Sequence, residues 1–310
     1  MVATQMIREL LENGVHFGHQ TNKWHPKMGK FIFGEKNKIY IIDLKKTEEA
    51  LIKAMDFVRN LTSEGKKVLF VGTKKQSKKI IKQAAQKSGM FYVDERWLGG
   101  CLTNFDTIRK SVERLRYIQQ IKEGGTYNEY AKKEKARIDK EEYKLLKNLG
   151  GIVEMTKLPD AVVVADAEIG DIAIKEARKV GVPVVALVDT NCDPNMVDYP
   201  IPGNDDAIRS IEYIISKIAE AAEEGVKESV TGKKVKDMKN PEQKPEDMPA
   251  ENVTEPAPAE KPKAEEKQET PASAEETPVE EKVEKKVAPA EEKPAQEQED
   301  APEGDIKLDM

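Results

Sequence analysis

The sequence contains three uninterrupted apolar runs, Val68-Leu69-Phe70-Val71, Ala161-Val162-Val163-Val164-Ala165 and Val184-Val185-Ala186-Leu187-Val188. Each has the length of a strand and lacks the alternation of polar and apolar residues that marks a half-exposed strand. A strand that is apolar on both faces must be covered on both. These runs therefore predict a parallel sheet between two layers of helices.

Helical patterns separate the runs. Apolar residues recur at helical spacing over 4–13, 47–63, 78–88, 172–180 and 205–223. A weaker strand over 91–93 and a short apolar run over 39–42 bring the candidate strands to five. Alternating strands and helices of this kind predict a flavodoxin-like or Rossmann-like α/β fold of three layers, with a five-stranded parallel sheet and right-handed crossovers.

Residues 103–149 interrupt this alternation. The stretch has no strand candidate and two helical patterns, which are separated by Gly124-Gly125 and opened by Thr103-x-x-Asp106 and Thr126-x-x-Glu129. We expect an inserted antiparallel coiled-coil helical hairpin that projects from the α/β domain, because both helices are densely charged. The alternative is that the two helices cover the sheet.

The composition changes near residue 226. From there to Met310 the chain has no Phe, Tyr or Trp and holds 11 of its 17 prolines. A mixture of Glu, Lys, Pro and Ala cannot bury enough apolar surface to offset the entropy of ordering the chain. We therefore expect one folded RNA-binding domain over 1–225, which includes the hairpin, and a disordered acidic tail over 226–310.

Positive charge is concentrated in the first half of the chain. Residues 1–150 carry 31 Lys and Arg against 18 Asp and Glu, residues 151–226 carry 6 against 15, and residues 227–310 carry 14 against 24. The first segment is basic enough to bind a polyanion such as RNA, and the other two segments are not. For any single lysine-rich helix, the alternative is a solvated face.

The sequence also bears on the compartment. Cys101 and Cys192 are far apart and have no partners at metal-binding spacing, which fits a reducing environment. The first ten residues lack the apolar core of a signal peptide, and no apolar run approaches the roughly 20 residues that span a membrane. We expect a cytoplasmic protein with no membrane partner.

A basic and aromatic loop follows the first helix. Between Lys23 and Lys38, five lysines alternate with Trp24, Phe31 and Phe33. Lysines bind phosphates and flat rings stack on unpaired bases, so the loop is a candidate RNA-binding surface. The alternative is that the two phenylalanines belong to the core, and we expect this of at least one of them.

All three histidines lie in or just before this loop, at His16, His19 and His25. A firm zinc site needs three or four ligands, and no cysteine is nearby. We therefore expect these histidines to bond loop backbone groups or to touch RNA, with no metal or other cofactor. A zinc ion held by the three histidines is the weaker alternative.

Two further segments could bind ligands. The turn over 72–75 follows a strand and opens a helix, so its backbone N–H groups and the helix dipole favour an anion. The chain has neither the P-loop nor the dinucleotide-binding glycine pattern, which argues against a nucleotide or another small-molecule substrate. The acidic turn over 189–194, with Asp198, Asp205 and Asp206 nearby, could hold magnesium, but an Asx-rich turn before a capped helix is the simpler interpretation.

Several motifs occur in an order that is typical of one family. They are Gly14-Val15-His16-Phe17-Gly18-His19, Lys23-Trp24-His25-Pro26-Lys27-Met28, Phe70-Val71-Gly72-Thr73-Lys74, Arg96-Trp97-Leu98-Gly99-Gly100, Pro159-Asp160-Ala161, Ile174-Lys175-Glu176-Ala177, Asp189-Thr190-Asn191 and Ile201-Pro202-Gly203-Asn204-Asp205-Asp206-Ala207. On these residues the chain resembles the bacterial small-subunit ribosomal protein S-two family over about residues 3–225. It departs from the family in having His25 where Asn is more usual and in its long tail.

The resemblance implies a non-catalytic constituent of the small ribosomal subunit that acts in translation. It implies binding to small-subunit rRNA near the head–body junction, contacts with neighbouring ribosomal proteins, and docking of the large messenger-binding protein. The residues that it favours for RNA binding lie in the basic loop, the glycine turn and the hairpin. They are Lys23, Trp24, Lys27, Lys30, Lys74, Lys75, Arg96, Asn104, Arg109, Lys110, Arg114 and Arg116.

Two other classes of protein fit the fold. A Rossmann-like enzyme that acts on a phosphorylated small molecule would need a catalytic set at the strand ends, where the sequence offers only acidic and Asx residues. A free-standing scaffold that grips protein partners with the hairpin would work without Lys74, Lys75 and Arg109.

Overall fold

The computed structural model describes residues 2–238; residues 1 and 239–310 lie outside the described residues. The last helix, α7 (Ile208–Met238), continues well past 225, where the folded domain was expected to end. Residues 226–238 are therefore helical, and the partly buried Val226 packs against the core. The remainder of the expected tail lies outside the described residues and stays a prediction.

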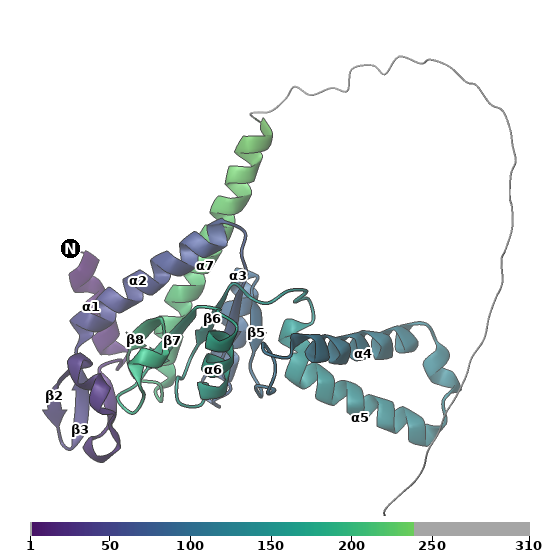
Figure 1. Ribbon diagram of the computed structural model, residues 1–310, viewed down its shortest axis with the longest axis horizontal. Coiled ribbons are helices and arrows are strands. Elements are labelled where there is room, and N and C mark those ends of the chain that lie inside the picture. Colours follow the sequence, from purple (N-terminus) through teal and green to yellow (C-terminus); the bar gives the residue numbers. More distant parts are fainter. Residues whose placement is uncertain (1, 239–310) are drawn as a thin grey trace, which may run out of the picture. The chain divides into compact units, whose positions relative to one another are not determined.

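The central sheet has five parallel strands, as predicted, and their order is β5-β4-β6-β7-β8 (Figure 1). Its strands are β4 (Val68–Val71), β5 (Phe91–Val93), β6 (Ala161–Val164), β7 (Val184–Val188) and β8 (Tyr199–Pro202). Counted along the chain within this sheet, the order is 2-1-3-4-5, which is the flavodoxin-like order. The fold class predicted from the apolar runs is therefore confirmed.

Both faces of the sheet are covered, because successive residues of a strand point to opposite sides. Val68 and Phe70 of β4 join one core, together with α2 (Leu44–Ser63), α3 (Lys78–Ser88) and α7. Leu69 and Val71 join the other core, together with α6 (Asp171–Lys179) and the base of the hairpin. All four side chains of β4 are buried, which explains the absence of polar alternation in this strand.

The apolar run over 39–42 does not belong to the parallel sheet. It forms β3 (Ile39–Ile42), the middle strand of a separate antiparallel sheet with β1 (Phe17–Gln20) and β2 (Ile32–Lys36). Asn37 and Lys38 connect β2 to β3 with φ values of 54° and 61°, which is typical of a two-residue hairpin turn. A short apolar run is compatible with a parallel or an antiparallel sheet. Here the two-residue turn between β2 and β3 makes their pairing antiparallel.

The fifth parallel strand is instead β8, which the sequence did not reveal. Its residues, Tyr199-Pro200-Ile201-Pro202, include two prolines, and proline is rare within sheets because it lacks the N–H donor. β8 lies at the edge of the sheet and pairs only with β7, so a missing donor on its outer side leaves no partner unsatisfied.

The inserted segment forms two antiparallel helices, α4 (Phe105–Glu123) and α5 (Lys132–Leu149), which lie side by side (Figure 1). Of their buried residues, Ile108, Val112 and Leu149 join the core of the sheet, whereas Leu115 and Ile118 are buried outside both sheet cores. Only the base of the hairpin therefore covers the sheet. Coiled-coil packing within the hairpin stays a prediction.

The second hairpin helix begins later than its sequence pattern predicted. Residues 126–129 form a short 3₁₀ helix, and α5 starts at Lys132. The Thr126-x-x-Glu129 pattern predicted a capping hydrogen bond at the start of this helix. In the structure the capping bond lies further along, where the Glu134 carboxylate accepts a hydrogen bond from the Ala131 backbone N–H. The N-cap of α4 also differs from the one that Thr103-x-x-Asp106 predicted. Asn104, and not Thr103, directly precedes the first residue of α4.

The N-terminal residues are fastened to the C-terminal part of the domain. α1 (Val2–Glu12) lies against α2, and Tyr213 of α7 donates to Glu9 at 2.8 Å. The backbone N–H of Asn204 donates to the Val15 carbonyl at 3.1 Å, and the backbone N–H of His25 donates to the Thr190 carbonyl at 2.7 Å. Residues 15–25 thus take their positions from residues 190–204.

Candidate nucleic-acid interface

The basic loop presents aromatic side chains to solvent. Trp24 is 38% exposed, and the centre of its ring lies 5.3 Å from that of Tyr40 on β3. Phe31 packs against the core, as expected of at least one of the two phenylalanines, whereas Phe33 is 78% exposed. The face of the small antiparallel sheet also leaves Phe17 47% exposed.

The lysines of this loop differ in what they contact. Lys27 donates to Asp193 at 2.6 Å, so its charge is partly compensated. The Lys30 ammonium lies 4.9 Å from the centre of the Phe31 ring. Lys23 and Lys30 are exposed and have no ion pair within residues 2–238.

Lys74, at the glycine turn after β4, points into the protein. Its side chain is 14% exposed, and its ammonium lies 3.0 Å from Asp166, 3.0 Å from Asp205 and 2.8 Å from Asp206. Burial lowers the pKa of Lys74, but hydrogen bonds to these three carboxylates outweigh it and raise the pKa overall. Lys75, the next residue, is exposed and makes no ion pair in the described part of the chain.

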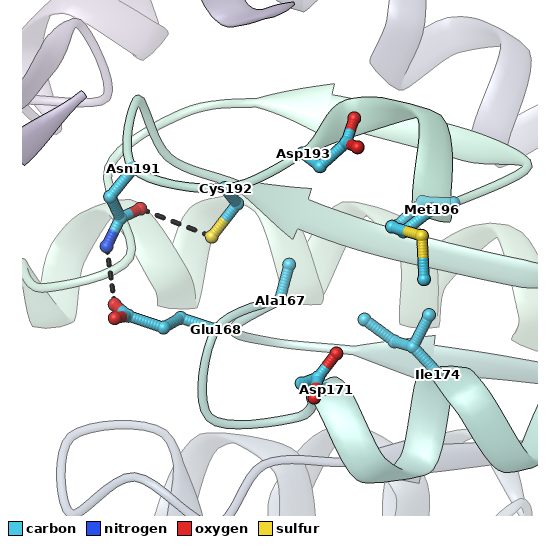
Figure 2. A pocket seen from close by; sticks show the side chains of 9 residues that line it. Ala167, Glu168, Asp171, Ile174, Asn191, Cys192, Asp193 and Met196 are labelled. Carbon is cyan, nitrogen blue, oxygen red and sulfur yellow. Dashed lines mark hydrogen bonds between the residues drawn. The ribbon is translucent and has the colours of Figure 1, made fainter. Parts of the chain in front are cut away.

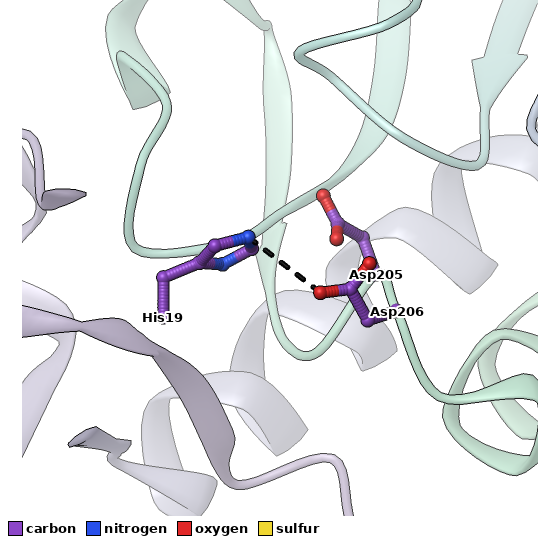
Figure 3. Close-up of side chains that lie close together, drawn as sticks. All are labelled: His19, Asp205 and Asp206. Carbon is purple, nitrogen blue, oxygen red and sulfur yellow. Dashed lines mark ion pairs between the residues drawn. The ribbon is translucent and has the colours of Figure 1, made fainter. Parts of the chain in front are cut away.

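The carboxylates around Lys74 belong to a larger strand-end cluster, made of His19, Asp166, Asp189, Asp205 and Asp206. His19 Nδ1 lies 3.1 Å from Asp189. Its Nε2 lies 3.6 Å from Asp206, and Figure 3 draws this ion pair. Asp166 and Asp189 follow β6 and β7, and Asp205 and Asp206 follow β8. The carboxyl ends of parallel strands meet at one edge, which brings these distant residues together.

Proton affinities in the cluster are strongly perturbed. A hydrogen bond to Asp189, opposed by burial, raises the pKa of His19 to about 9, so the imidazole is protonated at neutral pH. Burial, together with the charges of Asp166 and Asp189, raises the pKa of Asp205 to about 7. Asp205 is 1% exposed, and its Oδ2 has no hydrogen-bond partner among the described residues.

The structure separates the three histidines that could have bound zinc together. His25 accepts a hydrogen bond from the Lys27 amide at 3.3 Å and so caps the short helix that follows it. Burial lowers the pKa of the half-buried His16. Within residues 2–238, the donor set that could hold a cation is His19 with Asp205 and Asp206, whose ligand atoms lie within 4.8 Å of one another.

Glu176 of α6 fixes the loop that leads into the hairpin, and sequence reasoning assigned it no role. Its carboxylate accepts hydrogen bonds from Trp97 Nε1 at 3.1 Å, the Gly100 amide at 2.8 Å and the Leu102 amide at 3.0 Å. The amide and hydroxyl of Thr103 also donate to it, each at 3.2 Å. Two signals could have pointed to it: Glu176 belongs to the motif Ile174-Lys175-Glu176-Ala177, and it is an acidic residue among the apolar positions of an amphipathic helix.

The predicted basic residues of the hairpin fall into two groups. Arg114 donates to both carboxylate oxygens of Glu141, at 3.0 and 3.1 Å, and Arg116 donates to the Val153 carbonyl at 2.7 Å. These two guanidinium groups hold α4 against α5 and against the segment after it. Arg109 and Lys110, one turn earlier on α4, are exposed and carry no ion pair within the described residues.

Six of the twelve predicted residues therefore combine exposure with an uncompensated positive charge among residues 2–238. They are Lys23, Lys30, Lys75, Arg96, Arg109 and Lys110. Asn104, at the N-terminus of α4, is exposed and accepts a hydrogen bond from Thr107 at 2.8 Å. All six cations lie in the basic first half of the chain.

A cavity of about 300 Å³ lies at the acidic edge, between the segments that follow β6 and β7 (Figure 2). Asn191 donates to Glu168 at its wall, and the Cys192 thiol contacts Asn191 at 3.2 Å. Burial and nearby carboxylates raise the pKa of Cys192, so the thiol is a poor nucleophile. Asp193 caps the short helix after it, as expected of an Asx-rich turn.

A sequence profile of the family described as "Ribosomal protein S2" matches residues 10–225. The chain belongs to the ribosomal protein S2 family. Two relatives, both named small ribosomal subunit protein uS2, come from two strains of Treponema pallidum. Each is 56% identical over 223 residues, which cover 72% of this chain and 77% of the relative.

The family match spans the α/β domain and the whole hairpin, so the insertion belongs to the family's sequence pattern. Among residues 2–238, none of the helices combines the length and the apolar character needed to cross a membrane.

Proposed function

We propose that this protein is a structural, non-catalytic component of the small ribosomal subunit, in the cytoplasm, and that it binds small-subunit rRNA. The observation that carries the proposal is a set of six exposed cations in the basic half of the chain that have no ion pair in the part of the chain that the structure describes. Such cations bind a phosphate backbone with little cost of breaking internal ion pairs. We choose small-subunit rRNA as the ligand because the relatives are named small ribosomal subunit proteins.

Within this proposal the residues have different roles. Lys23, Lys30 and Lys75 neutralise phosphates, as do Arg96, Arg109 and Lys110, and the exposed ring of Trp24 packs on a base or ribose.

The remaining five candidates already make contacts within the protein. Lys27, Asn104, Arg114 and Arg116 have exposed side chains whose hydrogen bonds orient them beside the RNA. Lys74 would have to leave three carboxylates to reach a phosphate, so it supports the turn that presents Lys75.

Neighbouring ribosomal proteins, including the large messenger-binding protein, are proposed partners of the small antiparallel sheet. Phe33 is 78% and Phe17 is 47% exposed on strands β2 and β1 of this sheet. Large exposed apolar side chains on one small sheet favour a protein contact there. In this role the protein positions RNA and partner proteins and performs no reaction.

The test is the salt dependence of binding to small-subunit rRNA. If about six phosphates are contacted, the slope of log affinity against log salt is near −4 to −5. The variant Arg109→Ala/Lys110→Ala should make this slope less steep by about 1.4 to 1.8 units. The control Lys179→Ala/Arg209→Ala removes two exposed charges from the acidic segment and should leave the slope unchanged. A flat salt dependence of the wild-type protein contradicts the proposal.

We also propose that the strand-end cluster binds a divalent cation through His19, Asp205 and Asp206. Oδ2 of the buried Asp205 has no hydrogen-bond partner among residues 2–238, and this favours a cation there, because a buried carboxylate oxygen without a partner is costly. One imidazole and two carboxylates suit zinc. Binding requires that His19 loses its proton and that the Lys74 ammonium moves away from Asp205 and Asp206. Titrating zinc into the protein in a calorimeter should give one site, which Asp206→Asn abolishes; equal binding by the variant contradicts it.

A further inference from the structure

A cavity of about 330 Å³ opens where the base of the hairpin meets the sheet domain. Its wall is built by α3, by the end of the edge strand β5, and by the last turns of α5 with the Gly150-Gly151 pair after it. A nucleobase fits into a volume of this size. The cavity is separate from the acidic edge and from the basic loop.

Two tyrosines form the aromatic part of the wall. Tyr92 of β5 is half-buried and packs against the sheet core, so it is held in place. A Cβ atom at Gly151 would lie 2.7 Å from the Tyr92 ring and would also meet the Tyr92 carbonyl, so only glycine allows this close approach. Tyr143 of α5 is 68% exposed, and Leu146, one turn later, is 48% exposed.

Lys82 and Lys147 line the cavity beside two acidic residues, Asp94 and Glu95. α3 contains four lysines and no acidic residue, and Lys82 faces the cavity, exposed and without an ion pair among residues 2–238. From Tyr143 to its end, α5 has Lys144 and Lys147 and no acidic residue. The Lys147 ammonium is 3.5 Å from Glu95, at the cavity wall.

Of the two carboxylates that line the cavity, Asp94 is the one without an ion pair among residues 2–238. Asp94 follows β5 directly, and its side chain is half-buried and lines the cavity. No other residue in the described part of the chain donates a hydrogen bond to its carboxylate. A carboxylate of this kind accepts hydrogen bonds from the amino groups of nucleobases.

We propose that this cavity takes one unpaired nucleotide of the rRNA, with its base stacked on Tyr143 and its phosphate between Lys82 and Lys147. The proposal rests on the rRNA-binding function and adds a site to it. Exposed rings beside lysines fit a base and its phosphate, since every base has a face for stacking. An apolar side chain of a protein partner would gain nothing from the lysines.

The test compares Tyr143→Ala with Tyr143→Phe, which keeps the ring, in the full-length protein. Removal of one stacking ring should weaken the affinity for small-subunit rRNA roughly 5- to 100-fold. Tyr143→Phe should bind like the wild type. Ile172→Ala, which removes a 57% exposed apolar side chain from α6, is the matched control and should bind like the wild type. Because Tyr143 is so exposed, far-ultraviolet circular dichroism should show all variants folded.

Ultraviolet cross-linking of the wild-type complex, read by mass spectrometry, should place a nucleotide on Tyr143 or Tyr92. If the wild type binds rRNA but Tyr143→Ala binds equally well and neither tyrosine cross-links, the nucleotide site is wrong and rRNA binding stands. If Tyr143→Ala binds naked rRNA normally but joins small subunits poorly, the cavity serves a protein partner and the proposal is overturned. If the wild type itself fails to bind rRNA, the proposed function fails first.

Discussion

At the scale of single residues, the buried carboxylate of Glu176 joins α6 to the loop before the hairpin. Replacing Glu176 with Ala should lower the free energy of unfolding by about 3–5 kcal/mol, because several buried donors lose their acceptor. Urea unfolding at pH 7 measures this. Glu113→Ala on the exposed side of α4 should change stability by no more than about 0.5 kcal/mol. Equal losses in the two variants would show that the hydrogen bonds of Glu176 contribute little.

The same carboxylate gives a pH dependence. Burial raises the pKa of Glu176, but hydrogen bonds from the Leu102 and Gly100 amides and from Trp97 lower it below the ordinary value of 4.5. A lowered acid pKa stabilises the fold above the unfolded value, and this stabilisation is lost as pH falls through the folded value. Wild-type stability should therefore fall more steeply below pH 4.5 than that of Glu176→Gln. Parallel pH profiles of the two proteins would contradict this assignment.

Lys74 and Lys75 are adjacent but should respond oppositely to substitution. Lys74→Met removes the cation from three carboxylates and should cost about 3–5 kcal/mol of unfolding free energy. Lys75→Met should leave stability unchanged and reduce the salt slope of rRNA binding by a little under one unit. Thermal unfolding and filter binding of both variants check this. Sequence could not separate the two, because Asp166 and Asp205 are remote along the chain.

At the scale of secondary-structure elements, α7 crosses α2 with the two backbones in contact at Gly225. A Cβ atom there would collide with the Thr62 hydroxyl and the Arg59 carbonyl. Gly225→Ala should therefore push the helices apart and lower the unfolding free energy by about 1–3 kcal/mol, although alanine favours helix. Gly34→Ala, where a Cβ meets nothing within 4 Å, is the control and should be nearly neutral. Stabilisation by Gly225→Ala would show that the crossing is loose.

The central strands and the hairpin could be predicted because their signals are local. β4, β6 and β7 are buried on both faces and therefore read as unbroken apolar runs. β8 could not be predicted, because its place at an edge, which makes two prolines tolerable, depends on the whole sheet. The acidic part of the strand-end cluster was considered from the sequence as the weaker magnesium interpretation, but His19 and Asp166 were not assigned to it. His19 meets Asp189 and Asp206 only after the sheet has formed.

At the scale of the whole molecule, charge is divided between a basic first half and acidic later segments. Residues 239–310 carry 10 Lys and Arg against 22 Asp and Glu, so they offer little attraction to a polyanion. A chain that ends at Met238 should keep the urea midpoint of the full-length protein and bind rRNA within about twofold of it at roughly 0.15 M salt. Equilibrium unfolding and filter binding measure both quantities. Loss of rRNA affinity on truncation would give these residues a direct role in binding.

The fastening of residues 15–25 to residues 190–204 has a consequence for the protein's own synthesis. The basic loop is translated early. The backbone hydrogen bonds that fix this segment, to Thr190 and between Val15 and Asn204, need residues that are made about 170 to 190 positions later. Within the hairpin, beyond the base that packs on the sheet, Arg114 bonds Glu141 and Arg116 bonds Val153, which are only 27 and 37 positions later. In a nascent chain, the two hairpin helices can therefore pair before the basic loop is fixed. The basic loop reaches its final position only after the residues that follow the last two strands have been synthesised.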